Sequence, residues 1–557
     1  MRAKARRIFN SILAIVVLCG LAAVYHSQGL TWQDLLPRKS SVSHGAAAQT
    51  PVGGYGVSAA HPLAVEAGLE ILEQGGNAVD AAVAVSYVLA VVEPYASGIG
   101  GGGAALVFPA DSTRPQVYDY REAAPLSGRM PASFAGVPGF VAGMDLMHRE
   151  HGRLAMEKVL EPALRLAEEG FAANQSISDR LEANRYYLPV RSLPHFYPGG
   201  NPVRPGETVR QPELAATIRA IRDGGPDAFY RGEIAAAVAA GSGGLSLEDM
   251  RGYSVIKAEP ASAIFGGYTV YTAPAPMGGI ALLQVLQMAE ILQLQRYQPG
   301  SAGYIDLLTN IIKRSYYDRR ENIGDPRYIY VPAEELAGRD YARKMALEIS
   351  ADRFGGRLDD FIIEDTPADF EDHDNTTHFV VVDKEGTMVS ATNTISQFFG
   401  SGVYVKGFFL NNQLKNFSTS AGSPNLIEPG KRARSYISPT ILAKDGRPVL
   451  GIGTPGGNKI PMAMVQAILQ LTQYGLPLDE AIAAPRFFIE DKSVIYLEKD
   501  LPAAEKEALR ARGYTVIIYD APMAYGGLYA IHIDYASGRI YAVADPRRSG
   551  TAAVRHN

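Results

Sequence analysis

The spacing of apolar residues changes near Asp372, and this change limits the folds open to the 557-residue chain. Upstream, HPLAVEAGLEILEQGGNAVDAAVAVSYVLAVV predicts two helices, the first ending at Gly75-Gly76 and the second opened by Asn77. The second helix is apolar almost all round, so we expect it to be buried. Downstream, short apolar segments flank turn residues, as in antiparallel hairpins. Helices mostly before and strands mostly after predict an α+β layered body with antiparallel sheet.

The sequence also predicts where several hairpins and helices of this α+β body lie. HFVVVD and TMVSATNT flank a turn at 384–386, VYVKGFFLNN follows, and AIHIDY and IYAVAD flank a turn at 536–538. Another helix is predicted from about Lys459 to Tyr474. Helical patterns also dominate 138–251, where a Pro- and Gly-rich loop at 187–209 interrupts them.

The composition excludes several kinds of chemistry. The only cysteine, Cys19, lies in an apolar N-terminal segment, so the body of the protein has no disulfide framework, thiolate metal site or cysteine nucleophile. The formal net charge of −5 is spread along the chain, which argues against a nucleic-acid partner. Covalent chemistry in this protein must therefore use an oxygen or an amine.

The N-terminus has the order of an export signal. Basic residues precede an apolar run from Ser11 to Val24, and polar sequence follows. We expect residues 1–29 to be a signal peptide or a signal anchor, with residues 8–25 as a membrane tether if it is not cleaved, and 30–51 to be a linker. Either form predicts that the rest of the chain is exported, to the periplasm or the outer face of the cell.

The stretch DHDNTTHFVVVD contains two threonines at the entrance of a predicted strand. Asn375-Thr376-Thr377 fits the glycosylation pattern, which alone predicts a surface loop. Asp372 and Asp374 have the spacing of calcium ligands, but the Gly and Glu that complete such a loop are missing, so we expect no metal. The threonines are either ordinary residues at the edge of a strand or catalytic residues.

A threonine hydroxyl becomes a nucleophile when a base lies beside it. If the peptide bond before Thr376 is cut, its own α-amino group can take the hydroxyl proton. Asn375-Thr376 would then be a scissile bond, and Thr376 would begin a new chain.

Two glycine-rich segments could form turns with a function. SGIGGGGAALVF and GIGTPGG lack the Gly-Lys-Ser/Thr of a phosphate-binding loop. GIGTPGGNKIP predicts a strand, a sharp turn and a helix that begins near Asn458. The N–H groups of Gly456 and Gly457 could then receive an oxyanion, although a tight turn alone also favours glycine.

Together these motifs resemble the gamma-glutamyltransferase (gamma-glutamyltranspeptidase) family of N-terminal nucleophile hydrolases. The resemblance runs from about Val52 to Asp545 through GGNAVDAAVAV, VVEPYASGIGGGG, YDYREAAP, GVPG, TTHFVVVDKEG, FFLNNQLKNFS, SPTI, GTPGGNKI and ADPRR. It implies a four-layer αββα sandwich and a precursor that cuts itself into a large subunit, 52–375, and a small catalytic subunit, 376–557. The two subunits would form a heterodimer without cofactor or metal.

The resemblance also implies roles for individual residues. Thr376 would attack the γ-carbonyl of a γ-glutamyl compound such as glutathione, and water or an amino acid or peptide would accept the acyl group. Thr394 would form a hydrogen bond near the nucleophile, and the N–H groups of Gly456 and Gly457 would stabilise the oxyanion. Arg121 would clamp the substrate α-carboxylate, unless it forms a buried ion pair. The remaining contacts would come from Ser435 on the same carboxylate and from Gln413 and Asn416 on the α-amino group.

Three positions depart from the family pattern. Asn416 replaces an aspartate, Ser396 an asparagine and Tyr436 a second serine. An asparagine offers an ammonium group no charge, so these changes favour weaker glutamyl binding, a glutaryl group as in cephalosporin acylases, or an internal γ-glutamyl link of a polymer. The segment STSAGSPNLIEPGKRARSY is also shorter than a lid, which predicts an open cleft. A membrane-tethered homologue without turnover is the remaining alternative.

Overall fold

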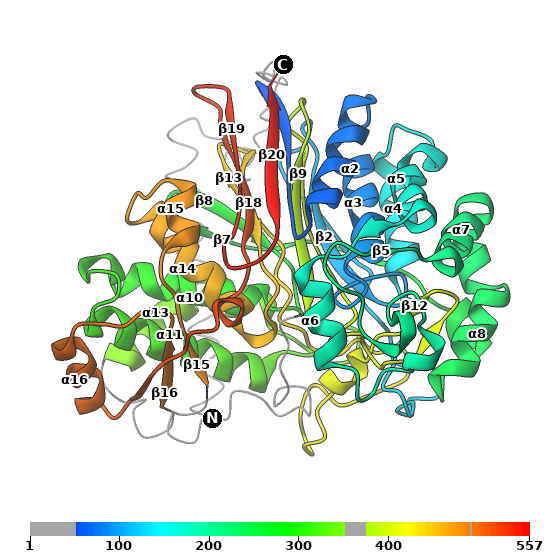
Figure 1. The fold of residues 1–557 in the computed structure, drawn as a ribbon. Coiled ribbons are helices and arrows are strands. Elements are labelled where there is room, and N and C mark those ends of the chain that lie inside the picture. The colour runs from blue at the N-terminus through cyan, green and yellow to red at the C-terminus, as the bar shows by residue number, and fades with distance from the viewer. Residues whose placement is uncertain (1–51, 351–374, 491–492, 557) are drawn as a thin grey trace, which may run out of the picture. The chain divides into compact units, whose positions relative to one another are not determined.

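Two antiparallel sheets stack face to face at the centre of the fold (Figure 1). The computed structural model describes residues 52–350, 375–490 and 493–556. The strands of the first sheet are, in spatial order, β20 (Thr551–His556), β1 (Gly54–Ala59), β9 (Thr376–Val382), β10 (Met388–Thr394), β2 (Gly102–Phe108), β3 (Gln116–Asp119) and β6 (Ile256–Ala258). Those of the second are β19 (Arg539–Ala544), β18 (Tyr529–Asp534), β14 (Arg447–Gly453), β13 (Thr440–Lys444), β8 (Tyr268–Thr272) and β7 (Ala261–Phe265).

Helices cover the outer face of each sheet (Figure 1). On the first sheet lie α2 (Pro62–Glu73), α3 (Ala78–Val92) and α4 (Phe140–His151), backed by α5 (Met156–Glu169), α6 (Gln175–Ala183), α7 (Pro212–Tyr230), α8 (Glu233–Ser242) and α9 (Leu247–Arg251). On the second lie α10 (Gly279–Ile291) and α14 (Ile460–Thr472), with α11 (Ala302–Asn322), α12 (Ala333–Leu336), α13 (Arg339–Ser350), α15 (Leu478–Ala483) and α16 (Ala503–Ala511). The predicted four-layer αββα sandwich is confirmed.

The central strands are buried on both faces, which explains their unbroken apolar sequence. Along β9, Phe379 and Val381 belong to the core under α2 and α3, whereas Val380 and Val382 belong to the core between the sheets. Side chains of a strand point alternately to its two faces, so one short segment contributes to both cores. Gly453 of β14 keeps the layers close, because a Cβ atom there would lie 2.3 Å from the His378 ring.

Several predicted elements match the structure. Every residue of α3 is buried, and Asn77 caps it in a capping box with Asp80. The hairpin of β9 and β10 pairs residue by residue, with Gly386 at φ 92° in its turn. The helix predicted at 459–474 is α14, and the hairpin near the end is β18 and β19.

The expectation that strands come mostly after Asp372 is only half right. Strands β1, β2, β3, β6, β7 and β8 precede that residue and supply much of both sheets. The export segment and linker at 1–51, Asp372 and Asp374 lie outside the described residues. Within the residues that are described, no helix has the length and apolar character needed to cross a membrane.

The two predicted subunits are interleaved within both sheets. Strand β1, upstream of the expected cleavage point, lies between β20 and β9, which are downstream of it. Likewise β2 pairs with β10, and β8 pairs with β13. A cut at Asn375-Thr376 would therefore leave these inter-strand hydrogen bonds intact.

Candidate active site

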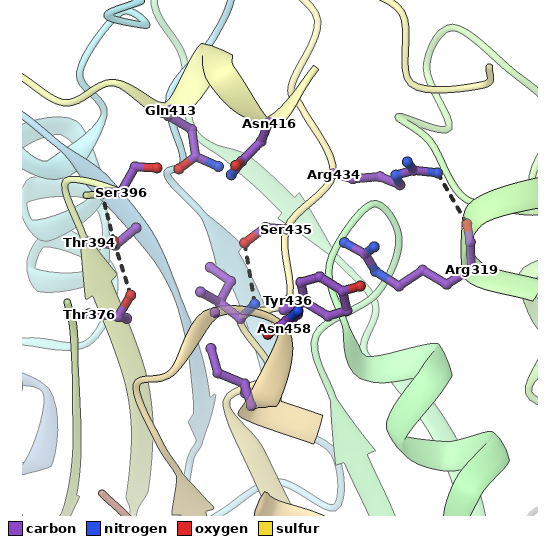
Figure 2. A pocket seen from close by; sticks show the side chains of 13 residues that line it. Arg319, Thr376, Thr394, Ser396, Gln413, Asn416, Arg434, Ser435, Tyr436 and Asn458 are labelled. Carbon is purple, nitrogen blue, oxygen red and sulfur yellow. Dashed lines mark hydrogen bonds between the residues drawn. The ribbon is translucent and has the colours of Figure 1, made fainter. Parts of the chain in front are cut away.

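The two adjacent threonines at the start of β9 face opposite sides of the first sheet. Thr377 points into the core, where its hydroxyl donates to Ser97 Oγ at 2.9 Å and lies 3.3 Å from the carbonyl oxygen of Asn393. Thr376 instead lines a pocket at the end of the strand (Figure 2). Only Thr376 can therefore present its hydroxyl to a substrate.

The Thr376 hydroxyl is held by Thr394, the residue opposite it on β10. The two residues are register partners, and Thr376 Oγ donates to Thr394 Oγ at 3.1 Å (Figure 2). Thr394 Oγ also accepts the Ser396 N–H at 2.9 Å. Ser396 can approach in this way because the chain turns there with φ 79°, a left-handed conformation unusual for a serine. The pair of bonds fixes where the Thr376 hydroxyl lies.

The peptide bond before Thr376 is enclosed. Asn375 is fully buried and Thr376 is 7% exposed, so the surface loop that the glycosylation pattern predicts is wrong. Neither polar side-chain atom of Asn375 has a hydrogen-bond partner among the described residues. Its carbonyl group belongs to the same peptide unit as the backbone nitrogen of Thr376.

No Asp, Glu, His or Lys side chain lines the described pocket. The lining residues are Arg319, Thr376, Thr394, Ser396, Gln413, Asn416, Arg434, Ser435, Tyr436, Ile437, Gly457, Asn458 and Ile460. His378 follows the nucleophile on β9, but burial lowers its pKa to about 3 and its Nδ1 lies 2.8 Å from Thr392 Oγ. The α-amino group that cleavage would expose on Thr376 is the base that this arrangement can provide.

The glycine-rich turn between β14 and α14 closes the pocket near the nucleophile. Gly456 and Gly457 have φ values of 138° and 53°, which favour glycine. Gly457 lines the pocket beside Asn458, whose carbonyl accepts the Tyr316 hydroxyl at 2.5 Å, whereas Gly456 lies just before them. The predicted strand, turn and helix are confirmed, although a short 3-10 helix at Gly457–Lys459 precedes α14.

One end of the pocket is formed by amide and hydroxyl side chains. Gln413 and Asn416 lie side by side on the 3-10 helix Gln413–Asn416, and Ser396 lies nearby (Figure 2). Buried Asn411 anchors this helix, because its side-chain amide donates to two carbonyl oxygens at 2.8 and 2.9 Å and its oxygen accepts the Gln413 N–H at 3.1 Å. Ser435 lies between this end and the arginines (Figure 2).

Arg121 is not at the pocket, contrary to the role that the resemblance implies. Its guanidinium forms a two-point ion pair with Asp119, at 3.1 and 2.8 Å, and donates to the carbonyl oxygen of Ala433 at 2.8 Å. Arg432 shares the same carboxylate at 2.9 Å, and these cations hold the pKa of Asp119 well below its ordinary value. The structure thus favours the alternative of a buried ion pair, with Asp119 as the acid.

The pocket arginines are Arg319 and Arg434, which the sequence analysis did not identify. The Arg319 guanidinium lies 3.5 Å from the ring centroid of Tyr436, and Arg434 donates to the carbonyl oxygen of Arg319 at 3.4 Å (Figure 2). Arg434 also donates to the carbonyl oxygen of Arg320 at 2.8 Å. The Tyr436 hydroxyl is buried and has no hydrogen-bond partner within the described part of the chain. Arg434 stands directly before Ser435, so its sequence position was a usable signal, whereas Arg319 has none.

The lining gives the pocket a positive character. It includes two arginines, and no Asp or Glu is found among its described residues. Such a site suits a carboxylate, which guanidinium groups and a phenol can bind together. A substrate ammonium group would find amide and hydroxyl oxygens at Gln413, Asn416 and Ser396, but no carboxylate among the lining residues that the structure describes.

Comparisons with known proteins agree with this arrangement. A family model described as gamma-glutamyltranspeptidase matches residues 64–555. The capsule biosynthesis protein CapD proenzyme of Bacillus anthracis is 40% identical over 513 residues, 92% of this chain and 93% of that protein. A glutathione hydrolase proenzyme of Escherichia coli is 34% identical over 563 residues, 91% of this chain and 95% of that protein.

A solved structure extends the likeness to the whole fold. The crystal structure of a cephalosporin acylase from Bacillus halodurans matches with a TM-score of 0.81 and 27% identity, covering 90% of this chain and 96% of that one. The matches in sequence and in structure span the sheets and the pocket alike. The chain belongs to the gamma-glutamyltranspeptidase family.

Proposed function

We propose that this protein is a self-processing γ-glutamyltransferase and hydrolase whose nucleophile is Thr376. The observation that carries the proposal is the position of the Thr376 hydroxyl, held by Thr394 in a pocket whose described lining contains no Asp, Glu, His or Lys. Family membership and relatives named as proenzymes support the same conclusion.

Processing begins with the buried peptide unit before Thr376. Thr376 Oγ attacks the carbonyl carbon of Asn375, the C–N bond breaks, and the acyl group moves from nitrogen to oxygen as an ester. Water then hydrolyses the ester, which leaves Asn375 with a carboxylate and Thr376 with a free α-amino group. Because strands of both fragments alternate in the sheets, the fragments stay together as a heterodimer.

Acyl transfer by the mature enzyme uses the same hydroxyl. The α-amino group takes the Oγ proton while Oγ attacks the γ-carbonyl of the donor, and the proton then passes to the leaving amine. N–H groups of the turn at Gly456 and Gly457 stabilise the oxyanion, each such donor contributing roughly 3 kcal/mol in comparable enzymes. Water or the amine of an amino acid or peptide then releases the γ-glutamyl group from Thr376.

Glutathione and related γ-glutamyl amides are the proposed donors, by analogy with the relatives named glutathione hydrolase. The donor carboxylate would lie toward Arg434 and Arg319, with the Tyr436 hydroxyl and Ser435 completing its hydrogen bonds. We place this group there and not at Arg121, whose guanidinium is bound by Asp119.

An amidase with a different acyl preference is the second candidate. It is favoured by the absence of an acidic residue among the described lining residues and by Asn416 at the end that would receive an ammonium. Glutaryl amides, which lack the α-amino group, would fit this pocket without an unpaired charge.

Export is part of the proposal. The basic and apolar segment at the N-terminus supports secretion to the periplasm or the cell exterior, with residues 8–25 as a tether if the signal remains uncleaved. Fractionation of cells that produce the full chain, before and after an alkaline carbonate wash, would separate a tethered from a released form. Recovery of the whole protein in the cytosol would contradict export.

Hydrolysis of two chromogenic amides tests the function. The processed enzyme should release p-nitroaniline from γ-glutamyl-p-nitroanilide, and added glycylglycine should accelerate release if an amine competes with water. Glutaryl-p-nitroanilide turned over at least as well would favour the second candidate. A processed enzyme that hydrolyses neither compound would contradict both.

A further inference from the structure

The side chain of Asn375, the residue before the nucleophile, has no part in the chemistry described so far. Asn375 is fully buried, and neither its amide nitrogen nor its amide oxygen has a hydrogen-bond partner among the described residues. Buried amides in folded proteins are normally hydrogen-bonded, because burial removes them from water. The reactive atom nearest to this amide along the chain is the scissile carbonyl carbon, which belongs to the same residue.

An asparagine amide can attack the carbonyl carbon of its own residue. Bonding of Nδ2 to that carbon closes a five-membered succinimide ring, and every atom of the ring comes from one residue. Well-oriented groups within one molecule react as if present at about 10⁵ M or more. Because no hydrogen bond to a described residue holds the Asn375 amide elsewhere, the side chain is available for this attack.

The N-to-O acyl shift prepares the carbonyl for the attack. In the precursor the carbonyl is part of a peptide bond, which is a poor electrophile with a poor leaving group. After the shift it is an ester of Thr376 Oγ, and the Thr376 α-amino group is free to take a proton from Nδ2. The described lining of the pocket contains no Asp, Glu, His or Lys that would compete for this proton.

Water is the competing nucleophile at this ester. The carbonyl belongs to a peptide unit between the fully buried Asn375 and Thr376, which is only 7% exposed. Water must enter this enclosed position to hydrolyse the ester, whereas the asparagine amide is already attached beside the carbonyl. Burial therefore favours the internal nucleophile over the external one.

We propose that Asn375 completes self-cleavage by forming a succinimide at the C-terminus of the large subunit. The proposal rests on the proposed function, because the ester on Thr376 must form first. Nδ2 bonds to the carbonyl carbon, the bond from this carbon to Thr376 Oγ breaks, and Oγ receives the proton that the α-amino group took from Nδ2. Water later opens the imide at either carbonyl, which leaves a C-terminal asparagine or isoasparagine.

The mass of the large subunit tests the proposal. Samples of the full chain, quenched in acid soon after processing, should contain a large subunit one water molecule lighter than the form that ends in a free asparagine. At mildly alkaline pH the light form should gain this water. The isoasparagine formed on opening is a lasting record of the imide, because direct hydrolysis of the ester gives asparagine alone.

A peptide from the end of the large subunit locates the change. Trypsin cuts after Arg357 and would release residues 358–375. In the light form, fragmentation should place the missing water on Asn375. After opening, the peptide should separate into two species that co-elute with synthetic standards ending in asparagine and isoasparagine. The standard ending in asparagine, taken through the same preparation, controls for ring closure during the work.

Asn375→Gln is the matched variant. Glutamine keeps the amide but requires a six-membered ring, which closes more slowly and leaves the ester to water. We expect this variant to be cut before Thr376 with loss of the light form, so that its large subunit has the hydrolysed mass from the first sample. The parent measurement decides the proposal by itself if the variant does not fold.

The outcomes separate the succinimide from the proposed function. A processed parent whose large subunit has only the hydrolysed mass and ends in asparagine alone would overturn the succinimide and leave cleavage by Thr376 intact. An equally abundant light form in Asn375→Gln would overturn the role of the asparagine amide. A folded parent that stays uncut would instead overturn the proposed function.

Discussion

Thr376 and Thr394 face each other across the β9–β10 pair with their hydroxyl oxygens 3.1 Å apart, and Thr394 also accepts the N–H of Ser396. Among the described residues, the Thr394 hydroxyl is therefore the side-chain group that orients the nucleophile. That hydroxyl is in turn fixed by a turn of unusual backbone conformation at Ser396. The geometry links the precursor and the mature enzyme, because both reactions start from the same oxygen.

Thr394→Val tests this link. The change keeps the size of the side chain but removes the hydrogen bond, and it leaves the Ser396 N–H without its acceptor. We expect processing and kcat each to slow by about tenfold, corresponding to roughly 1.4 kcal/mol. Thr394→Ser, which retains the hydroxyl, should stay near the parent in both. Unchanged processing of the valine variant, followed by gel over time, would remove Thr394 from the mechanism.

Asn416→Asp tests the charge of the amide-lined end. A carboxylate there would pair with a substrate α-ammonium group. We expect the ratio of kcat/KM for γ-glutamyl- over glutaryl-p-nitroanilide to rise by about tenfold, since charge-assisted hydrogen bonds contribute more than neutral ones. A ratio that stays the same would show that the α-amino group binds elsewhere.

Changing Arg121 to glutamine should lower stability, whereas changing Arg319 to glutamine should weaken substrate binding. Arg121→Gln removes one of the two cations that pair with Asp119, so we expect the free energy of unfolding to fall by about 3 kcal/mol with little change in KM. Arg319→Gln removes a cation from the pocket, so KM for γ-glutamyl-p-nitroanilide should rise about tenfold. Thermal unfolding and steady-state kinetics measure the two effects. A raised KM in Arg121→Gln alone would return Arg121 to the substrate.

Glu122 makes stability depend on pH. Its carboxyl is buried without a hydrogen-bond partner among the described residues, and burial raises its pKa to about 8. Because the folded pKa lies above the unfolded one, of about 4.3, the stabilisation is complete below pH 4.3 and is lost as the pH rises through 8. The loss is at most about 1.4 kcal/mol per pH unit.

Glu122→Gln should abolish that dependence. We expect the Tm of the variant, relative to the parent, to rise steadily between pH 5 and pH 8 in the processed enzyme. Glu66→Gln, at an exposed position of α2, provides the comparison. Parallel curves of Tm against pH for Glu122→Gln and the parent would show that Glu122 does not titrate in this range.

Local sequence predicted the elements whose signal is local. The hairpin of β9 and β10 follows from alternation and Gly386, and α3 from a run that is apolar all round. Strand β1 was not predicted, because GYGVSA has weak strand propensity. It is stabilised by β20, from the opposite end of the chain, and by β9. Pairing between distant segments cannot be read from either segment alone.

The site residues also differ in whether the local sequence marks them. Thr376 and the Gly456-Gly457 turn stood out because strand entrances and glycine turns have local patterns. Arg319 comes from the middle of α11 and reaches the pocket only through packing on Tyr436. The sequence left two roles open for Arg121, because an arginine in an ion pair and an arginine that binds substrate look alike in sequence. Asp119, two residues upstream, was the available warning.

The most direct test of the account is the intact mass of residues 30–557, expressed and folded, beside Thr376→Ala and Thr377→Ser. We expect two fragments from the parent and from Thr377→Ser, the smaller of the parent's fragments beginning at Thr376, and one uncut chain from Thr376→Ala. The parent fragments should co-elute in native gel filtration, because both sheets contain strands of each. A folded parent that remains a single chain would lack the catalytic amine and would contradict self-processing at Thr376.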